Sequence, residues 1–117
     1  MKQVTLTKIG GDKWIVAEKF TFVSNIIQEA ITIPRGFQTD LASIPRGFRW
    51  LISVNNNSVT PAVIHDYLYA TKGIVSRKEA DLIFLEMLKR YKVSYWKRKS
   101  MYYAVRMFGK KYYKGKE

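Results

Sequence analysis

The residues best suited to chemistry are the only histidine and three of the aspartates. His65 is followed directly by Asp66, and Asp40 stands between Pro34 and Pro45. Adjacent residues on a helix diverge by about 100°, so His65 and Asp66 cannot both point to the centre of a core. Both could border a groove at its edge, and the prolines would restrict the backbone around Asp40.

The third aspartate, Asp81, belongs to a stretch with helical periodicity. On a helical wheel it falls between Leu85 and Leu88, at the margin of the apolar stripe. A carboxylate in that position is partly buried and must find a partner. Arg77, four residues earlier, is the nearest candidate, and His65 or a backbone amide of the 34–50 loop are the others.

These polar residues allow four interpretations. The first is a hydrogen-bonded network that ties the loop to the helices without chemistry, because buried polar groups are normally satisfied in this way. The second is a divalent metal site, with ligands that suit Mg²⁺ or Mn²⁺ better than structural zinc. The third is acid–base or nucleophilic catalysis. The fourth is a peptide or carbohydrate groove without turnover.

The candidate residues differ slightly between these interpretations. Those for catalysis are Asp40, Ser43, His65, Asp66 and Asp81, and those for a metal are Asp40, His65, Asp66 and Asp81. A divalent metal ion is the one cofactor that this set suggests. The His-Asp pair invites comparison with the HD-type metal phosphohydrolases, but those sites need further histidines, which this chain lacks. No G-x-S-x-G elbow surrounds the serine, so the sequence leaves open whether the protein is an enzyme.

The positive charge of the chain is concentrated near its C-terminus. The 117 residues carry a net charge of +12. Residues 89–117 hold eleven Lys or Arg residues and one acidic residue, whereas residues 1–88 hold ten Lys or Arg residues and eight acidic ones. Such a field favours polyanionic partners: nucleic acid, an anionic membrane face or an acidic protein.

The last predicted helix combines basic and aromatic residues. Lys99, Arg106 and Lys110 line one stripe, which Tyr102 and Tyr103 flank. Such a surface can neutralise phosphates and stack bases, but it can equally be a solvated face that keeps the protein soluble. The candidate binding residues are Tyr69, Arg77, Lys99, Tyr102, Tyr103, Arg106 and Lys110.

Periodicity predicts a single α+β domain, with a small N-terminal antiparallel β-sheet, an irregular loop and three packed α-helices. We expect strands over residues 1–33, the loop over 34–58, the helices over 59–109 and a frayed basic tail over 110–117. Within the first part, residues 3–9 alternate as a strand, and residues 13–23 supply the returning strand. The helices are expected at residues 60–70, 77–91 and 95–108, with Thr60 as the first N-cap and a Ser-x-x-Glu capping box before the second.

Composition narrows the class further. Apolar residues make up 47% of the chain, which is enough for one core, and cysteine is absent. Disulfides and thiolate metal sites are therefore excluded. No apolar run has the length of a signal peptide or of a spanning helix. We expect a soluble protein made in the cytoplasm.

Four segments in this order resemble a known family. They are T-D-L-A-S-I-P (39–45), A-V-I-H-D-Y-L-Y (62–69), S-R-K-E-A-D-L-I-F-L-E-M-L (76–88) and M-Y-Y-A-V-R-M-F-G (101–109). Together they are similar to the phage and prophage family catalogued as domain of unknown function (DUF) 1353, over about residues 33–109. The motif positions carried over are Asp40, Ser43, Pro45, His65, Asp66, Tyr69, Arg77, Asp81 and Arg106.

The resemblance implies a bacteriophage or prophage origin, often near genes for tail and lysis functions, and no established activity. We therefore expect a phage-encoded accessory protein, a virion or tail-associated binding module that can be incorporated in the virion. Its partners would be other virion proteins, an acidic partner, or nucleic acid at the basic C-terminal region. One alternative is a small hydrolase, metal-dependent or not, that acts on cell wall through the Asp and His residues. The other is a basic nucleic-acid-binding protein.

Overall fold

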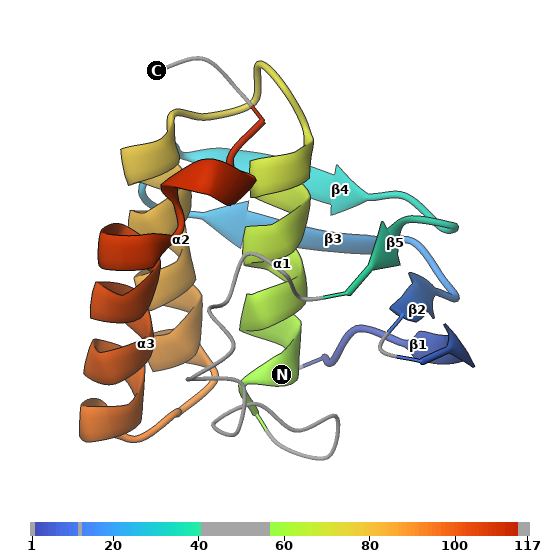
Figure 1. Ribbon diagram of the computed structural model, residues 1–117, viewed down its shortest axis with the longest axis horizontal. Helices are drawn as coiled ribbons and strands as arrows, with labels where there is room; N and C mark the ends of the chain where they lie inside the picture. Colours follow the sequence, from blue (N-terminus) through green and yellow to red (C-terminus); the bar gives the residue numbers. More distant parts are fainter. Residues whose placement is uncertain (1, 12, 41–56, 115–117) are drawn as a thin grey trace.

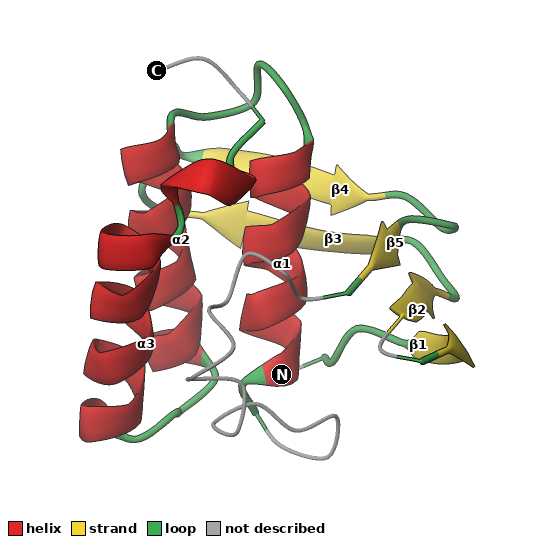
Figure 2. Cartoon of the chain, in the orientation of Figure 1, coloured by secondary structure: helices red, strands yellow, loops and turns green. Residues whose placement is uncertain are grey.

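The computed structural model describes residues 2–11, 13–40 and 57–114 of the chain (Figure 1). The α+β fold is confirmed: strands come first, and three helices follow. In Figure 2 β1, β2 and β5 lie on the right of the molecule and the α2–α3 pair on the left, while the β3–β4 hairpin runs behind α1. No helix in the described ranges has the length and apolar character needed to cross a membrane.

The strands form two small sheets rather than the single sheet that we expected. β1 (Leu6–Gly10), β2 (Lys13–Val16) and β5 (Gln38–Thr39) form one antiparallel sheet in the order β1-β2-β5. β3 (Phe20–Ser24) and β4 (Glu29–Ile33) form the other. The predicted strand over 13–23 is thus two strands, because the chain bends after Val16 and each half pairs with different neighbours.

The β3–β4 hairpin buries one of its faces. Phe20, Phe22 and Ser24 are buried and alternate with exposed residues, as expected for a strand with a period of two. Phe20 pairs with Ile33, and Phe22 with Ile31. These side chains join apolar residues of α1 and α2 in the larger core cluster of the described residues.

The three helices lie close to their predicted positions. α1 spans Val59–Ala70, α2 spans Arg77–Arg90 and α3 spans Tyr95–Phe108. The capping box of α2 is confirmed: the Ser76 hydroxyl accepts a hydrogen bond from the Glu79 amide at 3.1 Å, and the Glu79 carboxylate accepts one from the Ser76 amide at 3.0 Å. α3 packs on α2 in the smaller core cluster.

Thr60 does not cap α1 as we expected. The helix begins one residue before it, and Ser58 occupies the N-cap position. The Thr60 hydroxyl instead accepts a hydrogen bond from the Val4 amide at 3.0 Å. Thr60 therefore fastens the N-terminal segment to α1, a long-range contact that local sequence rules do not report.

Residues 110–114, which we expected to fray, are ordered against α1. Lys110–Tyr112 form a short 3-10 helix, η2. The Lys114 amide donates a hydrogen bond to the Tyr69 carbonyl at 2.8 Å, and the Tyr113 hydroxyl donates one to the Val75 carbonyl. The Tyr113 ring meets the Tyr69 ring edge-on, with 5.4 Å between centroids. The aromatic residues of this segment give it enough apolar surface to dock.

Candidate functional site

α1 presents its polar residues to two different environments. His65 and Tyr69 are one helical turn apart and share a face, while Asp66 points elsewhere. The Nε2 atom of His65 lies 2.7 Å from Oδ1 of Asp81, and the Tyr69 hydroxyl donates a hydrogen bond to the same oxygen at 2.6 Å. His65 and Asp81 are both fully buried, so α1 and α2 are joined by polar contacts inside the core.

The second carboxylate oxygen of Asp81 is bound by α3. Nη1 of Arg106 donates a hydrogen bond to Oδ2 at 2.7 Å. Arg106 thus occupies the position at this carboxylate that we predicted for Arg77. One carboxylate therefore connects all three helices.

Arg77 performs a different task in the same network. Its Nη2 donates to the carbonyl oxygens of Val105 at 2.8 Å and Arg106 at 2.7 Å, and its Nε donates to the Tyr69 hydroxyl at 3.2 Å. Those carbonyls belong to the last turn of α3, where the helix dipole favours a positive charge. Arg77 thus holds the C-terminal end of α3 against α1 and α2.

The electrostatics of this Asp81 network keep the carboxylate ionised. Burial by itself would raise the pKa of Asp81, but the hydrogen bonds from His65, Tyr69 and Arg106 outweigh it, and the pKa lies below its ordinary value. Burial, followed by the hydrogen bond to Asp81, raises the pKa of Tyr69, so its hydroxyl stays a donor. Among the described residues, no buried side-chain nitrogen or oxygen lacks a hydrogen-bond partner.

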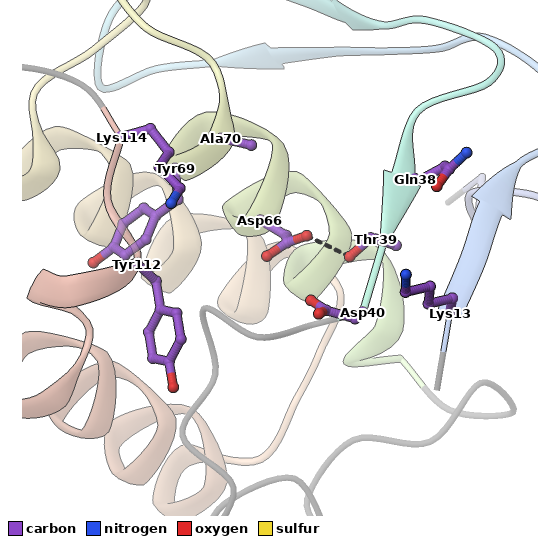
Figure 3. Close-up of a pocket in the computed structure, with 9 residues that line it drawn as sticks. All are labelled: Lys13, Gln38, Thr39, Asp40, Asp66, Tyr69, Ala70, Tyr112 and Lys114. Atoms are coloured by element: carbon purple, nitrogen blue, oxygen red, sulfur yellow. Dashed lines mark hydrogen bonds between the residues drawn. The ribbon is translucent and has the colours of Figure 1, made fainter. Parts of the chain in front are cut away.

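An open pocket lies beside this network (Figure 3). Its volume is about 360 Å³, within the range of small-ligand sites. Its walls come from β2, β5, the end of α1 and the C-terminal segment. The lining residues are Lys13, Gln38, Thr39, Asp40, Asp66, Tyr69, Ala70, Tyr112 and Lys114.

The polar groups of the pocket are arranged around two carboxylates. In Figure 3 the carboxyl groups of Asp40 and Asp66 lie between Tyr112 on one side and Lys13 on the other. The Thr39 hydroxyl donates a hydrogen bond to Asp66 and so joins β5 to α1. Ionised carboxylates accept hydrogen bonds only. The pocket is therefore suited to a ligand that carries several donors and one flat apolar surface.

The structure divides the four polar residues that we expected to form one site. His65 and Asp81 belong to the buried network, whereas Asp40 and Asp66 line the pocket. Tyr69 borders both, since its hydroxyl binds Asp81 and its side chain lines the pocket. Ser43 lies outside the described residues.

The divalent metal site expected at Asp40, His65, Asp66 and Asp81 is not assembled in the described part of the chain. There, no group of three or more His, Asp or Glu side chains is placed to hold a metal ion. The physical reason is the divergence of His65 and Asp66 on α1, which sends the imidazole into the core and the carboxylate to the pocket. Burial also keeps a substrate away from the imidazole that acid–base catalysis would need.

The candidate binding residues of α3 and η2 do not line the pocket. Lys99, Tyr102, Tyr103 and Lys110 are absent from its lining, and Arg106 is bound to Asp81. The expected basic stripe therefore loses one of its three cations to the network.

Sequence reasoning missed several pocket residues. Lys13 and Gln38 carry no local signal, because their position depends on how β2 pairs with β5. Thr39 stands next to Asp40 in the chain and could have been found through that motif. Tyr112 and Lys114 fall in the segment that we expected to fray, where two adjacent tyrosines were the available sign of packing.

Comparison with known proteins adds a family and nothing more specific. The model of a family described as "Protein of unknown function (DUF1353)" matches residues 14–105. No curated protein and no solved structure matches the chain.

Proposed function

The chain belongs to the DUF1353 family, and from this premise we propose that it is a ligand-binding accessory module rather than an enzyme. The observation that carries the proposal is the complete burial of His65 and Asp81: Nε2 of His65 contacts Oδ1 of Asp81, and Tyr69 and Arg106 bind the oxygens of the same carboxylate. His65, the only histidine of the chain, then stabilises the fold and does not act on a substrate. A ligand would bind in the open pocket next to the buried network.

The network supports binding by making the pocket rigid. Tyr69 is held through its hydroxyl by Asp81, and through its carbonyl by the Lys114 amide. Its neighbour Asp66 is tied to β5 by Thr39. Walls that come from distant parts of the chain are thus fixed before a ligand arrives, which lowers the entropic cost of binding.

We infer a small ligand rich in hydroxyl or amide donors, of the saccharide or peptide class. The two carboxylates would accept its hydrogen bonds, and the Tyr112 ring would cover one apolar face. The role as a phage virion or tail component comes from the family resemblance. That role can be tested by mass spectrometry of virions purified from a strain that encodes the protein. Detection of the chain in the virions would support the role, and its absence would contradict it.

The binding proposal is tested by NMR titration of the whole protein with N-acetylglucosamine oligomers and with short cell-wall peptides. We expect saturable shifts at Asp40, Asp66 and Tyr112 with one probe class. Asp40→Asn should weaken that binding about tenfold or more, since it removes a charge-assisted hydrogen bond of about 1.5–3 kcal/mol. Glu18→Gln is the matched control, because it neutralises an exposed carboxylate outside the pocket.

Two outcomes would contradict the proposal. The first is the absence of shifts at the pocket with every probe. The second is the release of cleaved fragments from a probe by the wild-type protein but not by Asp40→Asn, which would establish the hydrolase alternative instead.

A further inference from the structure

The outer face of α3 carries large apolar side chains that are more than half exposed. Trp96, Tyr103 and Met107 are 55%, 56% and 70% exposed. At about 100° per residue they fall within roughly 40° of one another on the helix. α3 packs on α2 through its other face and lies at the left edge of the molecule in Figure 1. An exposed apolar stripe of this kind marks an interaction surface.

Basic side chains lie beside Tyr95, the residue that precedes Trp96 on this helix. The Lys99 ammonium lies 5.6 Å from the ring centroid of Tyr95, and the Arg98 guanidinium lies 5.2 Å from the same ring. Tyr95 is itself 64% exposed. Between residues 95 and 108 there is no acidic residue. On this face, cations therefore lie beside aromatic rings. The same helix has no carboxylate that could neutralise these cations.

We propose that this α3 face, formed by Tyr95, Trp96, Lys99, Tyr103 and Met107, binds single-stranded nucleic acid. Lys99 would contact phosphates, and the Trp96 and Tyr103 rings would stack on bases. Trp96 and Tyr103 are seven positions apart, which places them about 10 Å apart along the helix axis. The Tyr102 ring meets Tyr103 at 5.4 Å between centroids and supports it from the side.

The aromatic rings favour this partner over other anions. An acidic protein or a DNA duplex could satisfy the cations, but stacking requires bases that are not already stacked on one another. Each base–aromatic contact contributes about 1–3 kcal/mol in single-strand binding proteins. Arg106 is excluded from the phosphate contacts because it binds Asp81. The proposal is independent of the pocket and of any ligand there.

The test uses the whole protein and fluorescein-labelled oligodeoxythymidine, with binding followed by anisotropy over a series of salt concentrations. We expect affinity to fall as salt rises. Tyr103→Ala should weaken binding by about tenfold, the loss of one stacking contact. Lys99→Ala should lower the slope of log affinity against log salt by about 0.7, the value for one phosphate on a single strand.

Matched controls separate the face from overall charge and from the pocket. Lys78→Ala removes an exposed cation of α2, so it should leave the affinity within about twofold if the α3 face is the site. Tyr112→Ala removes a pocket tyrosine and should likewise leave DNA binding unchanged. A failure of the pocket titration would not alter either expectation.

Three results would overturn the proposal. One is the absence of binding at low salt. Another is equal affinity for duplex and single strand with no loss in Tyr103→Ala, which would show charge attraction alone. The last is binding to poly-glutamate that is lost in Lys99→Ala while the oligonucleotide does not bind, which would assign the face to an acidic protein.

Discussion

The Asp81 network and the pocket beside it use the same kinds of side chain for opposite purposes. Asp81, on α2, is fully buried and receives hydrogen bonds from α1 and α3, whereas Asp40 is exposed and lines the pocket. His65 and Asp66 are adjacent in the chain and yet belong one to each region. Burial, rather than residue type, therefore decides which carboxylate serves the fold and which can meet a ligand.

The largest effect should come from breaking the network. Asp81→Ala leaves Arg106, His65 and Tyr69 without their acceptor. Removing one partner of a buried ion pair costs about 3–5 kcal/mol, so we expect that loss in the free energy of unfolding measured with urea. Asp40→Ala is the comparison and should lower the same quantity by less than Asp81→Ala does, because Asp40 is exposed. Equal losses of unfolding free energy in the two variants would contradict the distinction between a structural Asp81 network and a ligand-binding pocket.

A smaller effect should follow from crowding the junction at the end of α3. A Cβ atom added at Gly109 would lie 2.5 Å from the Val105 carbonyl oxygen and 2.9 Å from the Tyr69 hydroxyl. Gly109→Ala therefore requires the Val105 carbonyl, the Tyr69 hydroxyl that binds Asp81, or residue 109 itself to shift. We expect a loss of about 1–3 kcal/mol in thermal or urea unfolding. Lys110→Ala, the next and exposed residue, should unfold like the wild type, and a stable Gly109→Ala variant would mean that the junction can shift.

The smallest expected effect concerns acid. The pKa of Asp81 is lower in the folded chain than its ordinary value. Its contribution to stability is therefore complete above the ordinary aspartate pKa, about 3.9, and is lost as the pH falls through the lower, folded value. We expect the wild type to lose stability more steeply than Asp81→Asn below about pH 4. Parallel pH profiles for the two proteins would contradict this assignment.

The sequence predicted the helices well, because their signals are local. The apolar spacing of residues 77–91 and the Ser76–Glu79 capping box define α2 almost to the residue. The sheets were harder to predict, since the same alternating pattern in residues 13–23 fits one long strand or two short ones. Only pairing with distant partners, such as Trp14 with Thr39, separates β2 from β3.

The sequence predicted only part of the candidate site, because the rest depends on contacts between distant residues. The burial of Asp81 followed from its place on the helix, and His65 was among its expected partners. Arg106, 25 residues away, could not be chosen over Arg77 from spacing alone. The division between network and pocket depends on the direction in which α1 turns toward the core, which is a property of the packed helices.

The bond between Asp81 and Arg106 also bears on how the protein is made. The ribosome adds Arg106 well after Asp81, so for some time the nascent chain holds a carboxylate whose cation does not yet exist. An uncompensated charge resists removal from water. The first two helices should therefore stay loosely packed during translation, and the molecule should close only once α3 has emerged.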